Sequence, residues 1–196
     1  MELYLLSPPE QPFLGLLPDV LDAGVDRFQY RRPGLDDLTL SREVQTARRI
    51  CRDRSVPLMV NNRVDLAALH EVDGVHLGQD DLPVSEVKEQ WPGLTVGRTL
   101  RVDEPAVPGA DHFSLGPVFS PGSKTLDVKP CGIDGIGRVL DRIEQPLYVI
   151  GGLRPEHAFE LPRALQGVAV VSSVWDERDP VRAVTAWRDA LDVRST

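Results

Sequence analysis

Residues 57–83 constrain the fold more than any other part of this chain, because two short apolar runs are separated there by one helical segment. Residues 58–60 are apolar and lead at once into Asn61, Asn62 and Arg63, and residues 73–77 are mainly apolar and lead into a Gly-Gln-Asp-Asp segment at 78–81. Each predicted strand therefore ends in amides or carboxylates. The carboxyl ends of parallel strands meet at one rim of a sheet or barrel, where ligands bind. We expect a ligand site at that rim.

The same alternation continues along the whole chain and predicts parallel strands joined by right-handed crossovers. No linker or shift in composition interrupts it, so we expect one domain over residues 1–196. Residues 101–110 contain Pro105, Pro108 and Gly109, which predicts a degenerate fifth helix. Periodicity alone leaves a closed barrel and an open sheet as alternatives. The predicted strands cover residues 2–6, 27–31, 58–60, 73–77, 94–97, 112–116, 147–150 and 167–171, and the predicted helices cover 13–23, 38–52, 64–70, 84–90, 135–142, 155–165 and 180–193.

The net charge of −8 argues against nucleic-acid binding, which needs a basic surface to displace counterions. Cys51 and Cys131 provide neither a disulfide framework nor a paired metal motif, as expected for a reduced cytoplasmic protein. No apolar run approaches the ~18 residues that a membrane span requires. The amino-terminal residues lack the basic flank and long apolar core of a signal peptide.

Small residues follow the last two predicted strands. Gly151 and Gly152 come after strand seven, and Ser172 and Ser173 come after strand eight. Glycines let backbone N–H groups approach an anion closely, and the seventh and eighth loops of (β/α)8 barrels commonly bind phosphate. The alternative is that the glycines form a tight turn and the serines cap a helix.

Two motifs near the middle of the chain carry a family resemblance. NNRVDLA at 61–67 and DGVHLGQDDLP at 73–83 resemble the N-D-R-x-D-x-A and D-G-V-H-L-G-Q-x-D motifs of the thiamine phosphate synthase/TenI family, at the right separation. The resemblance extends from the first strand to the last. It implies a compact (β/α)8 TIM barrel rather than an open sheet. It also implies a thiazole phosphate bound by Gly151, Gly152 and Ser172, and less clearly by Ser173, where the family usually has Ala.

In synthase members of this family the rim binds a pyrimidine diphosphate and Mg²⁺. The family pattern is incomplete here, because Asn62 replaces a metal-binding Asp, Pro33 replaces a Lys and Pro121 replaces a Thr. Mg²⁺ prefers carboxylate oxygens, so these losses weaken the metal and diphosphate site. Asp81 would bind metal only if the chain is a synthase. The implied substrate and anion pocket consists of Gln29, Arg31, Asn61, Asn62, Thr99, Ser123 and Lys124.

These departures resemble TenI-type proteins, which also share the Gly97-Arg98-Thr99 pattern, and they favour a thiazole tautomerase that transfers a proton without a cofactor. Pro117, however, stands where the tautomerase has its catalytic His. The acid–base residue is therefore unassigned, with Lys124, Cys131 and His76 as candidates. One alternative is a thiamine phosphate synthase that uses Mg²⁺, joins hydroxymethylpyrimidine diphosphate to thiazole phosphate and releases pyrophosphate. Another is a catalytically silent thiazole-phosphate-binding barrel. The expected partner is a phosphorylated thiazole, and the resemblance suggests a homodimer.

Overall fold

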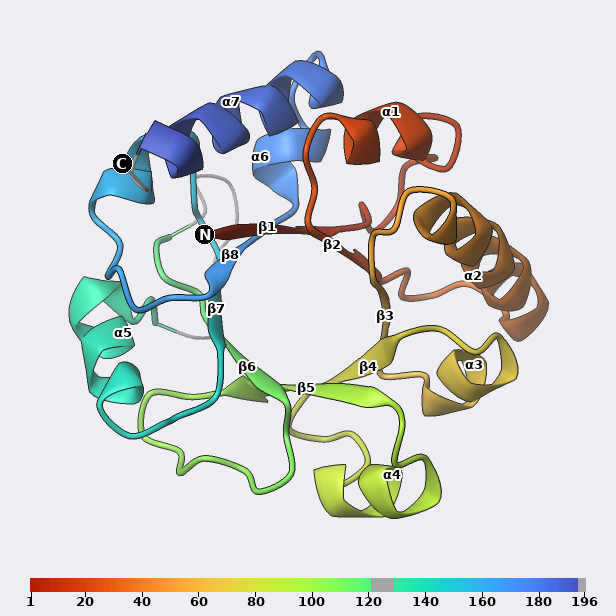
Figure 1. Ribbon diagram of the computed structural model, residues 1–196, viewed down its shortest axis with the longest axis horizontal. Helices are drawn as coiled ribbons and strands as arrows, with labels where there is room; N and C mark the ends of the chain where they lie inside the picture. Colours follow the sequence, from red (N-terminus) through yellow and green to blue (C-terminus); the bar gives the residue numbers. More distant parts are fainter. Residues whose placement is uncertain (121–128, 194–196) are drawn as a thin grey trace.

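Eight parallel strands form a closed barrel in the computed structural model, which describes residues 1–120 and 129–193 (Figure 1). Each strand pairs with the next along the chain, and β1 closes the barrel by pairing with β8. The prediction of a (β/α)8 barrel is confirmed. The strands are β1 (Glu2–Leu6), β2 (Arg27–Tyr30), β3 (Leu58–Asn61), β4 (Gly74–Leu77), β5 (Thr95–Leu100), β6 (His112–Leu115), β7 (Leu147–Ile150) and β8 (Gly167–Val170).

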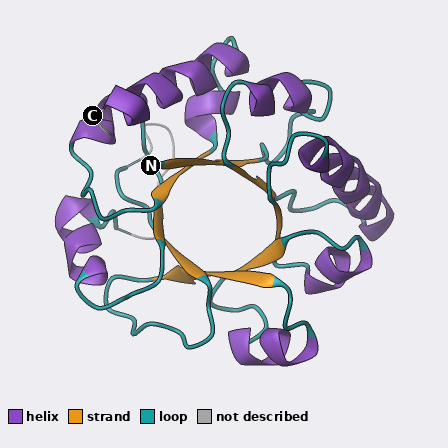
Figure 2. Cartoon of the chain, in the orientation of Figure 1, coloured by secondary structure: helices purple, strands orange, loops and turns teal. Residues whose placement is uncertain are grey.

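Helices surround the barrel on its outside (Figure 2). Residues 101–111 contain no helix, which confirms the degenerate connector after β5. After β7 the predicted helix is only a 3₁₀ turn, and a short helix that the sequence did not predict follows β8. The helices are α1 (Leu17–Asp22), α2 (Asp37–Arg52), α3 (Val64–Leu69), α4 (Val84–Gln90), α5 (Gly132–Leu140), η1 (Pro155–Phe159), α6 (Ser172–Trp175) and α7 (Pro180–Val193).

Alternation along the strands divides the buried side chains into two sets. One set, which includes Leu3, Leu5 and Phe28, belongs to the large core that also contains the buried faces of the helices. The other set forms a separate cluster inside the barrel, where aromatic and sulfur-containing side chains pack together. Its buried members are Tyr4, Leu6, Met59, Tyr148 and Ala169.

The amino end of the barrel is filled by a hydrogen-bonded group of polar side chains. Glu2 accepts from the hydroxyl of Tyr148 (2.5 Å) and from the amide of Gln166 (2.6 Å). The guanidinium of Arg27 lies 5.7 Å from the ring centres of both Tyr4 and Tyr148 and 3.8 Å from the Glu2 carboxylate. We call Glu2, Arg27, Tyr148 and Gln166 the amino-end plug. It leaves the carboxyl end of the barrel as the place for a site.

Three aspartates repeat one structural role around the amino end. Each immediately precedes an even-numbered strand, and its carboxylate accepts a hydrogen bond from a backbone N–H of the strand before it. Asp26 accepts from Leu3 (2.7 Å), Asp73 from Leu58 (2.8 Å) and Asp111 from Val96 (2.6 Å). The repeat satisfies N–H groups that would otherwise lie unpaired at the strand starts.

Replacing Asp73 with Ala should lower the free energy of unfolding by about 1–3 kcal/mol, because the Leu58 N–H loses its acceptor. Asp26 and Asp111 also pair with Arg188 and Lys88, whereas the described residues place no cation within ion-pair distance of Asp73. Urea denaturation measures the change. Asp73→Asn keeps an acceptor oxygen, so its free energy of unfolding should fall clearly less. Equal decreases in the two variants would contradict the role given to the carboxylate.

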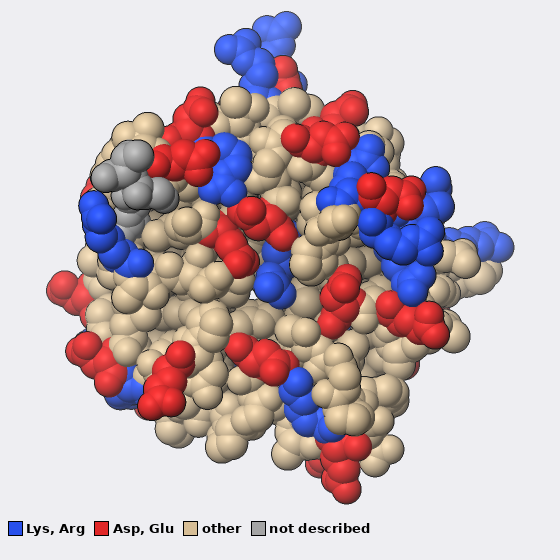
Figure 3. Space-filling model, in the orientation of Figure 1, with Lys and Arg blue, Asp and Glu red and all other residues tan. Residues whose placement is uncertain are grey.

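The strands succeed one another clockwise in Figure 1, and because their crossovers are right-handed, this view faces the amino ends. Figure 3 shows acidic and basic side chains interspersed over that face. None of the described helices combines the length and apolar character that crossing a membrane requires.

Candidate active site at the carboxyl end of the barrel

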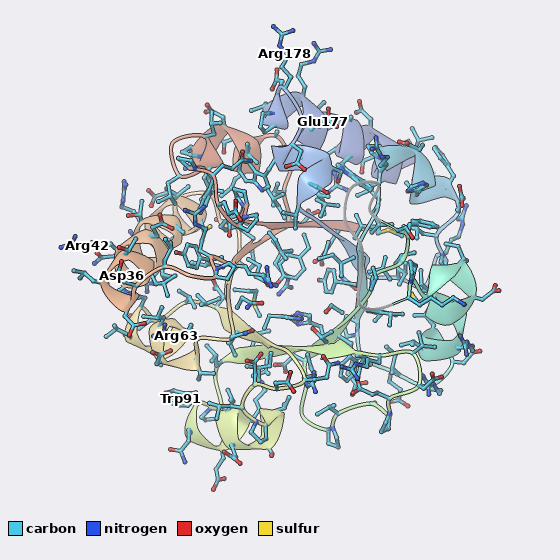
Figure 4. The ribbon with its side chains drawn as sticks, turned by 180° about the vertical axis from the view of Figure 1, so that it is seen from behind. Asp36, Arg42, Arg63, Trp91, Glu177 and Arg178 are labelled. Carbon is cyan, nitrogen blue, oxygen red and sulfur yellow. The ribbon has the colours of Figure 1, made fainter. Side chains whose placement is uncertain are left out.

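The loops after β2 and β3 enclose a cavity of about 300 Å³ at the carboxyl end, the face seen in Figure 4. Arg31, Asn61 and Asn62 all line it, so the structure brings together three of the predicted pocket residues. Asn62 has a φ of +64°, a conformation that Asn tolerates better than most residues. Its N–H donates to the carbonyl of His76, which ties the end of β3 to β4.

Arg31 is the cation of this cavity that remains available for a ligand. Its guanidinium has no hydrogen-bond or ion-pair partner within the described ranges, 1–120 and 129–193. Arg32 instead donates to the carbonyls of Pro8 and Gln11, so it does not replace the Lys missing at Pro33. Figure 4 labels Arg63, whose guanidinium binds the carboxylates of Asp65 (2.6 Å) and Asp37 (2.7 Å).

A group of hydroxyls surrounds one imidazole nitrogen inside the barrel. His76 Nε2 lies 2.9 Å from Thr99 Oγ1 and 3.2 Å from Ser114 Oγ. Burial, assisted by the positive charges of Arg98 and Arg31, lowers the pKa of His76 to about 4. The ring is therefore neutral at pH 7 and a weak base, which argues against His76 as the acid–base group.

Gln29 is buried on the inner face of β2 and contacts an aromatic residue of the barrel interior. Its amide donates to the hydroxyl of Tyr4 at 2.8 Å. Arg31 follows Gln29 by two positions, so alternation predicts that both side chains lie on the same face, with Arg31 nearer the carboxyl end. The amide oxygen of Gln29 has no hydrogen-bond partner among residues 1–120 and 129–193, so it remains for a ligand.

Asp81, the predicted metal ligand, folds back on its own loop. One of its carboxylate oxygens accepts from the N–H of Gly78 at 2.5 Å. The described residues contain no group of three His, Cys, Asp or Glu side chains that could hold a metal. Nearby, Gln79 donates to Glu104 (3.1 Å). Burial opposes ionisation of Glu104, but hydrogen bonds from the Arg101 N–H and from Gln79 hold the pKa of its carboxyl below the ordinary value.

The loop after β7 requires its two glycines. Gly151 and Gly152 have φ values of +101° and +66°, and a Cβ on either would approach Pro117 or Phe119 within 2.6 Å. Substitution at either position is therefore strained. Because β7 and β8 are neighbours in the barrel, this loop lies beside the one that follows β8.

The two serines after β8 point in different directions. Ser172 is exposed, whereas the hydroxyl of Ser173 accepts from the indole N–H of Trp187 (3.2 Å). The Ser173 side chain is thus used in packing α6 against α7. Within the described part of the chain, the backbone N–H groups of Gly152, Ser172 and Ser173 donate to no carbonyl, so they remain available to an anion.

Three predicted site residues, Ser123, Lys124 and Cys131, gain no support from the structure. Ser123 and Lys124 lie outside the described residues. Cys131 immediately precedes α5, its N–H donates to the Pro117 carbonyl, and burial raises the pKa of its thiol. A thiol with a raised pKa is a poor nucleophile and base at neutral pH, so the structure gives no support to a catalytic Cys131.

Sequence reasoning missed Tyr4, Glu104 and Ser114. Tyr4 and Ser114 would follow from alternation, because Tyr4 shares a strand face with Leu6, and Ser114 shares one with His112. Glu104 lies in the irregular connector after β5, where no periodicity indicates direction.

A closed barrel with a cation-lined rim and free backbone N–H groups after its last two strands is typical of (β/α)8 enzymes that bind phosphorylated small molecules. Residues 3–174 match the model of the TMP-TENI family, thiamine monophosphate synthase, and the chain belongs to that family. It is 32% identical to the thiamine-phosphate synthase of Caldivirga maquilingensis over 87% of each chain, and 35% identical to that of Chlorobium luteolum over 92% of this chain and 88% of that one. The structure of thiamine phosphate pyrophosphorylase from Pyrococcus furiosus is similar, with a TM-score of 0.91, 25% identity, and coverage of 100% of this chain and 97% of that one.

These similarities confirm that the chain belongs to an enzyme family, and they overturn the tautomerase interpretation. Relatives 32–35% identical over most of the chain are thiamine-phosphate synthases. The tautomerase interpretation rested on Asn62 and Pro33, which weaken the metal and diphosphate site, and on the Gly97-Arg98-Thr99 pattern. Local losses of this kind do not outweigh similarity along the whole chain.

Proposed function

We propose that this protein is a thiamine phosphate synthase, which joins a hydroxymethylpyrimidine diphosphate to a thiazole phosphate and releases pyrophosphate. The observation that carries the proposal is the similarity to synthases over almost the entire chain. The available cation at Arg31 and the free N–H groups near Gly152 and Ser172 support it, since the reaction needs two separate anion sites.

In the proposed reaction the bond between the pyrimidine methylene carbon and the diphosphate oxygen breaks, and the thiazole nitrogen forms a new bond to that carbon. The electron pair of the broken bond leaves with pyrophosphate. Arg31 would stabilise the charge that develops on this leaving group. Gln29 and Thr99 would contact the pyrimidine, and the N–H groups of Gly151, Gly152 and Ser172 would hold the thiazole phosphate.

The residues at the rim fit a magnesium site that has one protein carboxylate instead of two. Mg²⁺ is often held by one or two protein carboxylates together with substrate phosphates. Asp81 supplies one carboxylate, of which one oxygen is not used by Gly78, and Asn62 supplies an amide in place of a second. Asp81 would therefore hold the ion with the diphosphate, and the ion would neutralise part of the leaving-group charge.

The proposal is tested by incubating the protein with both substrates and Mg²⁺ and measuring thiamine phosphate and pyrophosphate. We expect equal amounts of both products, and none when the thiazole phosphate is omitted. Absence of product at enzyme concentrations equal to those of the substrates would overturn the proposal.

Asn62→Asp should tighten Mg²⁺ binding in the presence of pyrophosphate by about tenfold, because a carboxylate replaces a neutral amide at the rim. Asp is also tolerated at the positive φ of this position. Calorimetric titration of Mg²⁺ with pyrophosphate measures the change without depending on turnover. Asp81→Asn should weaken binding by a comparable factor; an unchanged affinity in Asn62→Asp would show that residue 62 does not reach the ion.

A further inference from the structure

Two imidazoles lie next to each other inside the barrel, between the amino-end plug and the carboxyl end. His76 on β4 and His112 on β6 are 7% and 3% exposed, and their ring centres are 6.0 Å apart. Tyr148 and Tyr4 pack edge-on against His112, at 5.4 and 6.3 Å between ring centres. Aromatic rings therefore occupy one side of His112 and His76 occupies another.

Gly97 makes room for one nitrogen from each ring. A Cβ on Gly97 would lie 2.3 Å from His112 Nε2 and 2.6 Å from His76 Nδ1, so both nitrogens face the same small space. Both are buried, and neither has a hydrogen-bond partner among residues 1–120 and 129–193. Buried polar atoms rarely remain unpaired, so the natural partner of each nitrogen is the other.

The far nitrogen of His76 connects this pair to the proposed pocket. His76 Nε2 lies 2.9 Å from Thr99 Oγ1, and Thr99 is one of the residues proposed to contact the pyrimidine. A neutral imidazole has one donor and one acceptor nitrogen, so the bond at Nδ1 decides what Nε2 can do. Burial keeps both rings neutral, since it lowers the pKa of His76 to about 4 and that of His112 to about 3.

We propose that His112 is a positioning residue whose Nε2–H donates, directly or through one water, to Nδ1 of His76. His76 then carries its hydrogen on Nε2 and donates to Thr99 Oγ1. Thr99 in turn keeps its own hydroxyl hydrogen, which it donates to Ser114 Oγ at 3.4 Å in the ligand-free protein and to an acceptor nitrogen of a heteroaromatic ligand when one is bound. This inference rests on the proposed function only for the identity of that ligand, the pyrimidine diphosphate. Both imidazoles adopt the tautomer that neutral histidine favours in water, so the arrangement is self-consistent.

The tautomer is tested directly by ¹⁵N NMR of the imidazole nitrogens in the full-length protein. We expect His76 to be protonated on Nε2 in the natural sequence, and the resonance of its unprotonated Nδ1 to shift in His112→Phe, where the donor to that nitrogen is lost. His112→Gln keeps an N–H donor near the same position and should restore the natural resonance. Tyr148→Phe is the matched control, because it removes a hydroxyl that binds Glu2 without touching the facing nitrogens. A hydrogen on Nδ1 of His76, or unchanged His76 resonances in His112→Phe, would overturn the inference.

Measurements of KM distinguish a positioning role of His112 from a general effect on folding. His112→Phe should raise KM for the pyrimidine diphosphate by about tenfold, the equivalent of one hydrogen bond, and leave KM for the thiazole phosphate within about twofold. Equal rises in both constants would contradict positioning. If the protein has no synthase activity but the NMR result holds, the proposed function fails while the hydrogen bond between the two histidines stands. If His112→Phe does not fold, the natural protein and His112→Gln still decide the tautomer.

Discussion

Ser172→Asp is expected to abolish binding of thiazole phosphate. Ser172 is exposed at the start of α6, shortly after β8, where the neighbouring N–H groups have no carbonyl partner within the described residues. A carboxylate about 4 Å from a phosphate charge would repel it by about 4 kcal/mol at an effective dielectric constant of about 20. Affinity should therefore fall by more than about 100-fold. Equilibrium binding of thiazole phosphate measures the loss.

Ser172→Ala is the matched control for this variant. It removes the hydroxyl but keeps the backbone N–H, so affinity should remain within about fivefold of the natural protein. Both variants should retain the same circular dichroism spectrum, because residue 172 is exposed. Unchanged affinity in Ser172→Asp would mean that the phosphate binds elsewhere on the barrel.

Trp187→Ala should lower the free energy of unfolding by about 3–5 kcal/mol, a large part of the 5–15 kcal/mol typical of a folded protein. Trp187 is 0% exposed on α7, and its indole N–H donates to Ser173. Removing the ring leaves a cavity in the main core and an unpaired hydroxyl beside α6. Urea denaturation measures the change.

Two further tryptophan variants divide the effect into its causes. Trp91→Ala, at a residue that is 39% exposed, should cost about 1 kcal/mol or less. Trp187→Phe keeps most of the apolar contact but loses the hydrogen bond to Ser173, so we expect an intermediate loss. A Trp187→Ala variant as stable as Trp91→Ala would contradict the buried position of this helix face.

The alternation of strand and helix periods predicted the order of the elements, and the family resemblance, rather than the periodicity, favoured the closed barrel over an open sheet. The closing helix at 180–193 and the strand at 2–6 agree with the structure at both ends. The predicted fifth strand ended at Gly97, but β5 continues through Arg98 and Thr99 to Leu100. A glycine weakens a strand when it lies inside one, so Gly97 resembled the end of the strand. The helix predicted over 155–165 is only the 3₁₀ turn η1. Helix propensity is a local property and does not include the packing of a segment against its neighbours.

The site was predicted in part. Arg31, Asn61 and Asn62 line one cavity because the ends of neighbouring parallel strands necessarily meet. The structure also places His112 in the barrel interior, facing His76. The two imidazoles come from β4 and β6 and meet over Gly97 of β5. The residue pattern of a single strand does not show which side chains of other strands it will contact.

The amino-end plug has a consequence for the order of events in the proposed reaction. In the part of the chain that the structure describes, Glu2, Tyr148 and Arg27 occupy the amino end of the barrel, so the two substrates and two products of the proposed reaction would share the entrance at the carboxyl end. Pyrophosphate departing past Arg31 would occupy the route by which the next pyrimidine arrives. Slow departure of a product would then limit the turnover rate, and free pyrophosphate would inhibit by competing with the incoming diphosphate.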